Sequence, residues 1–108
     1  MIDLSYIQVV LRTLDSLLPY ARNSRTHSDE QIAQVAASIK EFGWTNPILV
    51  DAEGTVIAGH ARLLAARKLG MDQVPVIVLA HLTPAQRRAL VIADNKLAMN
   101  AGWDSRTE

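Results

Sequence analysis

The most informative stretch of the sequence is Val56-Ile57-Ala58-Gly59-His60-Ala61-Arg62-Leu63-Leu64-Ala65-Ala66-Arg67-Lys68-Leu69-Gly70. It has the pattern of a strand, a glycine turn and a helix that opens with a histidine and an arginine. The start of a helix carries free backbone N–H groups and the positive end of the helix dipole, and a glycine lets the turn come close to a bound phosphate. Arg62, in the first turn, would add a forked charged contact.

The same residues also have a purely structural interpretation. Gly59 would then only supply a positive φ angle, and Arg62 would be a solvated helix residue. Because one glycine and one arginine make a weak motif, these residues alone favour the structural interpretation over a phosphate site.

Two further helices are marked by their first turns. Ser28 and Gln31 have the spacing of a capping box and Gly43 supplies a stop, so the sequence predicts a helix from about Asp29 to Phe42. Another helix is predicted to open at residues 83–86, where threonine, proline and glutamine follow one another as in a capped first turn.

Strand patterns occur at residues 6–12, 47–50, 55–58 and 74–79. The second and third flank a short connection that contains a glycine, which predicts adjacent antiparallel strands. The fourth is a continuous apolar run of the kind found in buried strands, and Pro75 is tolerable near the start of such a strand.

The composition is that of one globular domain. The chain has 108 residues, of which 49% are apolar and 20% charged. We predict one domain over residues 1–103, followed by a frayed tail or the start of a linker at 104–108. Eleven basic and eleven acidic residues give a formal charge of zero, which excludes a global field that would hold nucleic acid non-specifically.

Several classes of site and location are excluded by what the sequence lacks. Without cysteine there is no disulfide framework, thiolate nucleophile or thiolate metal site. No apolar run reaches the length of a membrane span, and a basic start followed by a long apolar core is missing. A cytoplasmic protein is therefore expected.

The order of the parts carries a resemblance to a known family. The pieces that match are Asn23-Ser24-Arg25, Ser38-Ile39-Lys40-Glu41-Phe42-Gly43, Asn46-Pro47-Ile48-Leu49-Val50, Ala58-Gly59-His60-Ala61-Arg62 followed by Ala65-Ala66, and Leu69-Gly70 leading to Val74-Pro75-Val76. In this order the chain resembles, from about Val9 to Asp104, the N-terminal domain of the ParB family, also called the ParB-like nuclease domain. The resemblance implies an α+β fold of the ParB and sulfiredoxin type, a small mixed sheet with packed helices.

The resemblance also implies a phosphate site. In chromosome-partitioning ParB proteins this domain binds cytidine triphosphate, and a Gly-Glu-Arg-Arg segment cradles the phosphates. Gly59 and Arg62 match that segment, whereas His60 stands in place of the glutamate and Ala61 in place of the first arginine. His60 would contact phosphate or carry a proton, although a lone histidine at a helix start is more often a capping or surface residue.

A magnesium site is implied by a second segment. Ala93-Asp94-Asn95-Lys96-Leu97 resembles the family's Glu-Asn segment, which helps to hold magnesium. Asp94 and Asn95 offer the oxygen ligands that Mg²⁺ accepts, although a solvated pair fits the residues equally well. Ala98 stands where an arginine usually follows, and the chain has no cysteine for sulfiredoxin chemistry.

Other basic residues are secondary candidates. Arg22 and Arg25 lie in a polar loop that runs near the nucleotide in this family, which makes them candidates for phosphate contacts. Arg87, Arg88 and Lys96 would form a basic face toward DNA, although charges on a late amphipathic helix usually meet only water.

The predicted function is a nucleotide- or phosphate-binding regulatory module of a DNA-modifying or DNA-partitioning protein, with Mg²⁺ and CTP or ATP as ligands. With His60 after the glycine and Asp94-Asn95-Lys96-Leu97 later in the chain, the sequence looks most like ParB-like domains attached to DNA methyltransferases and to phage or plasmid DNA-modifying proteins. DNA contact would come through additional domains or partners. A homodimer is one of the expected assemblies, and no membrane association is expected.

Two other functions remain open. One is a metal-dependent DNA nuclease, and the other is a non-catalytic protein- or DNA-interaction domain with a decayed pocket. The chain is not predicted to be an enzyme on its own. If it is active, the expected reaction is hydrolysis of a nucleoside triphosphate or cleavage of DNA.

Overall fold

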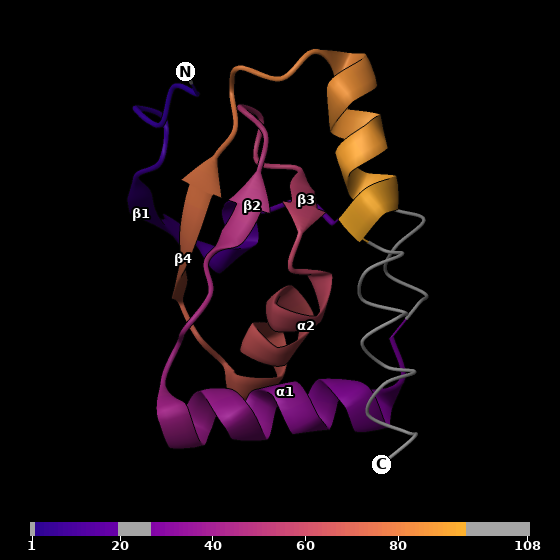
Figure 1. Ribbon diagram of the computed structural model, residues 1–108. Helices are drawn as coiled ribbons and strands as arrows, with labels where there is room; N and C mark the ends of the chain where they lie inside the picture. The colour runs from indigo at the N-terminus through magenta and orange to yellow at the C-terminus, as the bar shows by residue number, and fades with distance from the viewer. Residues whose placement is uncertain (1, 20–26, 95–108) are drawn as a thin grey trace.

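The structure, a computed structural model, describes residues 2–19 and 27–94 (Figure 1). Its labelled elements are strand β1 (Val9–Thr13), a 3₁₀ turn η1 (Leu14–Ser16), helix α1 (Asp29–Phe42), strands β2 (Ile48–Val50) and β3 (Val56–Ala58), helix α2 (His60–Leu69) and strand β4 (Gln73–Val78). Residues 84–94 form one more helix, drawn in orange and yellow. None of the described helices is long and apolar enough to cross a membrane.

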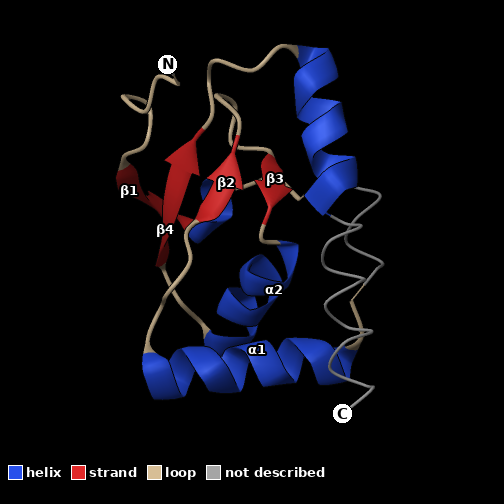
Figure 2. Ribbon diagram, in the orientation of Figure 1, coloured by secondary structure: helices blue, strands red, loops and turns tan. Residues whose placement is uncertain are grey.

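The four strands form one mixed sheet in the order β1-β4-β2-β3. β4 pairs antiparallel with β1 and parallel with β2, and β2 pairs antiparallel with β3. The predicted adjacency of the strands at 47–50 and 55–58 is therefore confirmed. Helix α2 packs on one face of this sheet and helix 84–94 on the other, and α1 lies beyond α2 (Figure 2).

The larger core lies between one face of the sheet and α2. It joins Ile48, Val50, Val56, Val74 and Val76 of the strands to Leu63 and Ala66 of α2. α1 packs against α2 on the side away from the sheet. Trp44 is partly buried and packs against this core.

A smaller core lies on the opposite face. Ile57 of β3, Leu79 after β4 and Val91 of helix 84–94 are its buried members. Strand residues alternate between the two cores, since Val56 belongs to the first and Ile57 to the second. Helix 84–94 therefore covers the face of the sheet that α2 leaves open.

The helix ends follow the predicted capping chemistry. α1 begins and ends where the sequence predicts, with the Ser28 hydroxyl accepting a hydrogen bond from the Gln31 amide and Gly43 at φ +81°. At the start of helix 84–94 the capping box is complete, because the Gln86 amide donates to the Thr83 hydroxyl and the Thr83 amide donates to the Gln86 side chain.

Two strand predictions differ in detail. The strand expected at residues 6–12 is found at Val9–Thr13, because Ile7 donates its amide to the Leu4 carbonyl in a turn. Pro75 lies in the third position of β4, a central strand, rather than at its first position. It is accommodated because pairing with β2 begins only at Val76, so that only β1 lies beside β4 at this proline.

Candidate functional site

A single glycine joins β3 to α2. Gly59 has φ +98° and ψ +27°, a left-handed conformation that side chains disfavour. A Cβ atom there would also lie 3.3 Å from the Ile48 side chain and 3.4 Å from the Ile48 Cα. Glycine is thus required both by the backbone angle and by the close approach to β2.

The first turn of α2 has free backbone donors. No side chain caps the helix, and its first intrahelical bond joins the Leu63 amide to the Gly59 carbonyl. The amides before Leu63 therefore have no acceptor within the helix. They present the positive end of the helix dipole at the β3–α2 turn, as an anion site requires.

His60, the first residue of α2, is buried rather than at the surface. Its exposed fraction is 3%. Burial lowers the pKa of His60 to about 4, the nearby His27 lowers it further, and a hydrogen bond with the Val56 backbone acts in the opposite direction. The imidazole is therefore neutral at pH 7, and its Nε2 has no hydrogen-bond partner among the described residues. The alternative that His60 is a surface residue is wrong, because its ring packs inside.

Arg62 lies half-buried on the same first turn. With the Asn46 amide oriented so that both of its polar atoms are satisfied, Nη2 of Arg62 donates to the Asn46 oxygen at 2.9 Å. Asn46 precedes β2, so the guanidinium group is anchored beside the turn that Gly59 forms.

Asp94 comes to the same place from the end of helix 84–94. Burial raises the pKa of Asp94, while the charges of His27 and Arg62 lower it in part. Figure 1 shows the yellow end of this helix approaching the β3–α2 turn. The predicted residues Gly59, His60, Arg62 and Asp94 are thus gathered around the start of α2.

The remaining predicted residues are not brought to this place. Nη1 of Arg87 lies 2.6 Å from Oδ2 of Asp51 near the opposite end of helix 84–94, and Arg88 is exposed. Arg22, Arg25, Asn95 and Lys96 lie outside the described residues, as does the tail at 104–108. Within residues 2–19 and 27–94, no three metal-ligating side chains stand together.

Two residues, His27 and Asp51, have structural surroundings that the sequence did not indicate. His27 lies close enough to act on both His60 and Asp94, yet its spacing from either gives no motif. Asp51 is a buried carboxylate whose Oδ1 accepts the amides of Glu53 and Thr55, both at 2.9 Å. An aspartate three residues before a glycine is typical of a turn, and this spacing is the sequence signal that could have indicated that Asp51 accepts the turn amides.

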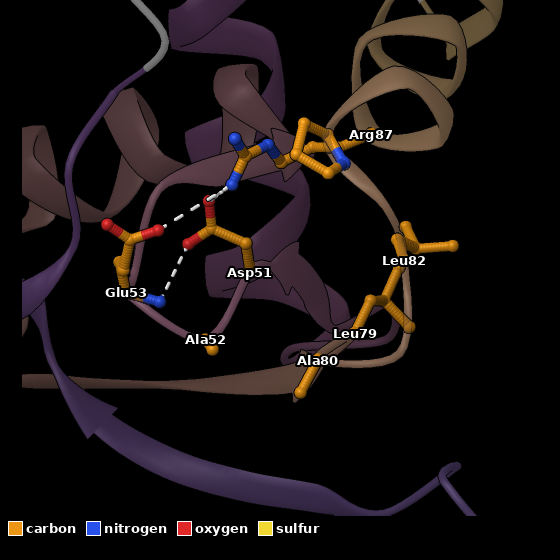
Figure 3. Close-up of a pocket in the computed structure, with 8 residues that line it drawn as sticks. Asp51, Ala52, Glu53, Leu79, Ala80, Leu82 and Arg87 are labelled. Atoms are coloured by element: carbon orange, nitrogen blue, oxygen red, sulfur yellow. Dashed lines mark hydrogen bonds and ion pairs between the residues drawn. The ribbon is translucent and has the colours of Figure 1, made fainter.

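A pocket of about 270 Å³ lies beside Asp51 (Figure 3). Its walls come from the β2–β3 connection, the segment after β4 and the start of helix 84–94. The polar groups of Asp51 and Arg87 that border it already bind each other. None of its lining residues belongs to the start of α2, so the pocket is separate from the anion site there.

Comparison with known proteins decides the family. The ParB N-terminal domain matches residues 4–95. The chain belongs to this family. It is 57% identical over 82 residues to the ParB-like nuclease domain-containing protein YnaK of Escherichia coli, covering 76% of this chain and 94% of that protein.

Solved structures agree with this ParB assignment. The chromosome-partitioning protein ParB from Caulobacter crescentus, complexed with CTP-gamma-S, matches with a TM-score of 0.70 and 26% identity over 82% of this chain. This chain spans 52% of that one. Sulfiredoxin from Arabidopsis thaliana matches with a TM-score of 0.65 and 19% identity, over 79% of this chain and 98% of that one. The α+β fold of the ParB and sulfiredoxin type is confirmed.

Proposed function

We propose that this ParB domain binds the phosphates of a nucleotide at the start of α2, as a regulatory module of a DNA-directed protein. The observation that carries the proposal is the uncapped first turn of α2, which follows a left-handed glycine and holds Arg62 beside it. Backbone donors and one guanidinium group converge there, and both favour an anion.

Asp94 gives the site a carboxylate beside these cationic groups. A carboxylate next to a phosphate is unfavourable unless a cation lies between them. Mg²⁺ is commonly bound by one or two carboxylates together with water and substrate phosphates. Asp94 is the described residue that would hold it, and a magnesium ion would supply the charge that links Asp94 to the phosphates.

CTP is the first nucleotide to test, because the Caulobacter ParB was solved with a CTP analogue. ATP is the second. His60 and Ala61 stand where other ParB domains place glutamate and arginine, so this chain would hold the phosphates with one guanidinium group and the backbone of α2. The roles of Arg22, Arg25 and Asn95 in the same site, and of Arg88 and Lys96 toward DNA, remain predictions, as does association with a DNA methyltransferase.

Isothermal titration of the whole chain with CTP, ATP and GTP, each with Mg²⁺, tests the proposal. Arg62→Ala should abolish saturable binding. Arg67→Ala is the matched control, since Arg67 is an exposed arginine at the far end of the same helix. Binding that survives Arg62→Ala, or no heat with any nucleotide from a folded protein, would overturn the proposal.

The nuclease alternative predicts a different result for a variant of the same site. The name of the E. coli relative favours testing it. A nuclease should cleave DNA in the presence of a divalent cation and lose that activity in Asp94→Asn while the fold is kept. An interaction domain with a decayed pocket predicts that neither Arg62→Ala nor Asp94→Asn has an effect.

A further inference from the structure

The edge strand β1 is apolar and uncovered. All five of its residues are exposed, with Val9 at 58% and Leu11 at 64%. β1 pairs with β4 on one side, and no described residue pairs with its other side. Native proteins usually protect such an edge with charges, proline, a bulge or a covering segment. Here the strand itself offers only Arg12.

The register shows which backbone groups face the free edge. Leu14 donates its amide to the Asp72 carbonyl at 2.8 Å, continuing the alignment that pairs Arg12 with Val74. Hydrogen-bonded pairs alternate with non-bonded pairs in an antiparallel ladder, so the even-numbered residues of β1 bond to β4. The amides and carbonyls of Val9, Leu11 and Thr13 therefore point outward. Pro75 lies opposite Leu11, where β4 needs no donor toward β1.

The side chains of β1 alternate between the two faces of the sheet in the same way. Val9 pairs with Ile77 and shares its face, which is the face that helix 84–94 covers farther along the sheet. The buried members of that small core are Ile57, Leu79 and Val91, none of them in β1 or β4. The side chains of Val9 and Leu11 are thus left without a covering layer among the described residues.

We propose that β1 pairs antiparallel with β1 of a second copy, about a two-fold axis at Val10. This register places Val9 opposite Leu11 of the partner copy, with both sets of outward backbone groups bonded. It also places Gln8 opposite Arg12. Arg12 is the only charged residue between positions 7 and 13, so no like charges meet. The strand is thus complementary to itself, as an isologous interface requires.

Exposed apolar side chains gather along the chain around the free edge of β1. The exposed large side chains of this region are Ile2, Leu4, Tyr6, Ile7, Val9, Val10 and Leu11. Val9 and Leu11 lie on one face of β1 and Val10 on the other, so exposed apolar side chains flank the free edge on both faces, where the paired strand of a second copy would cover them.

Sedimentation equilibrium tests the proposal on the whole chain without nucleotide, from about 1 to about 100 µM, since the weaker protein–protein interfaces have micromolar affinity. The expected result is a dimer that Leu11→Lys weakens at least ten-fold. Phe42→Lys is the matched control, because Phe42 is 71% exposed on α1 and the change adds the same charge. A monomer at all concentrations would overturn the proposal and favour pairing of the edge with a strand of another protein. A dimer that Leu11→Lys leaves intact would also overturn it.

Amide hydrogen exchange gives a second, position-specific readout. Val10 and Arg12 should be protected at every concentration, because their amides bond to β4. Val9, Leu11 and Thr13 should become protected only as the dimer forms, and Leu11→Lys should remove that protection. Dimerisation without this alternation would contradict pairing through β1. Neither measurement depends on nucleotide binding, so failure here leaves the proposed function untouched.

Discussion

Nη1 of Arg87 lies 2.6 Å from Oδ2 of Asp51, and this ion pair joins the start of helix 84–94 to the connection between β2 and β3 (Figure 3). The other oxygen of Asp51 accepts two backbone amides. One buried carboxylate therefore shapes the turn and holds the start of the helix that carries Asp94. This contact and Asp94 of the candidate site thus lie on the same helix.

Asp51→Ala should destabilise the protein by about 2–4 kcal/mol, because two backbone amides and a half-buried arginine lose their buried acceptor. Urea denaturation measures the change. Glu53→Gln is the control. Glu53 lies 3.7 Å from the same Arg87 nitrogen but is exposed, so its loss should change stability by no more than about 0.5 kcal/mol. Equal effects of the two variants would show that Asp51 has no special role.

Gly59→Ala should cost about 2–4 kcal/mol, from the left-handed backbone and from crowding against Ile48. Gly70→Ala is a matched control, since Gly70 also has a positive φ but has no atom within 4 Å of a built Cβ. It should cost only the backbone part, about 1–2 kcal/mol. The difference between the two denaturation midpoints reports the approach of Gly59 to β2. A Gly59→Ala variant no less stable than Gly70→Ala would refute that close approach.

Stability should fall in acid because of His60. Its pKa is about 4 in the folded protein, against an ordinary histidine value of 6.5, so the unfolded chain binds the proton more readily. The loss begins as pH falls below about 6.5 and is complete below about 4, where it approaches about 3 kcal/mol.

His60→Gln isolates this effect. Denaturation of the variant and of the wild type should differ in pH dependence only below about 6.5. Asp94 titrates with the opposite sign, because its raised pKa favours the folded state when it is protonated, and the comparison leaves that contribution unchanged. An identical pH profile in the two proteins would show that His60 is not buried in its neutral form.

The parts of the fold that were predicted from sequence are those specified by neighbouring residues. Ser28, Gln31 and Gly43 fix the ends of α1 through contacts within one helical turn, and the connection at 51–54 fixes a local hairpin. The parallel pairing of β2 with β4 joins segments separated by α2, and no local pattern encodes it.

The candidate site also has parts that the local sequence predicts and parts that depend on the folded chain. Gly59 and Arg62 were recognisable because a helix start is visible in the sequence. The burial of His60 depends on its surroundings in the folded chain, and the Asp51–Arg87 pair joins residues 36 positions apart. These contacts exist only once the sheet has formed and helix 84–94 has packed on it.

The most direct test of the phosphate site is nitrogen–proton NMR of the labelled chain during titration with CTP and Mg²⁺. The largest amide shifts are expected at His60, Ala61 and Arg62, because phosphate oxygens would accept hydrogen bonds from the first turn of α2. Arg62→Ala should remove these shifts and Arg67→Ala should not. No shifts from a folded protein, or shifts confined to the pocket beside Asp51, would contradict a phosphate site at the start of α2.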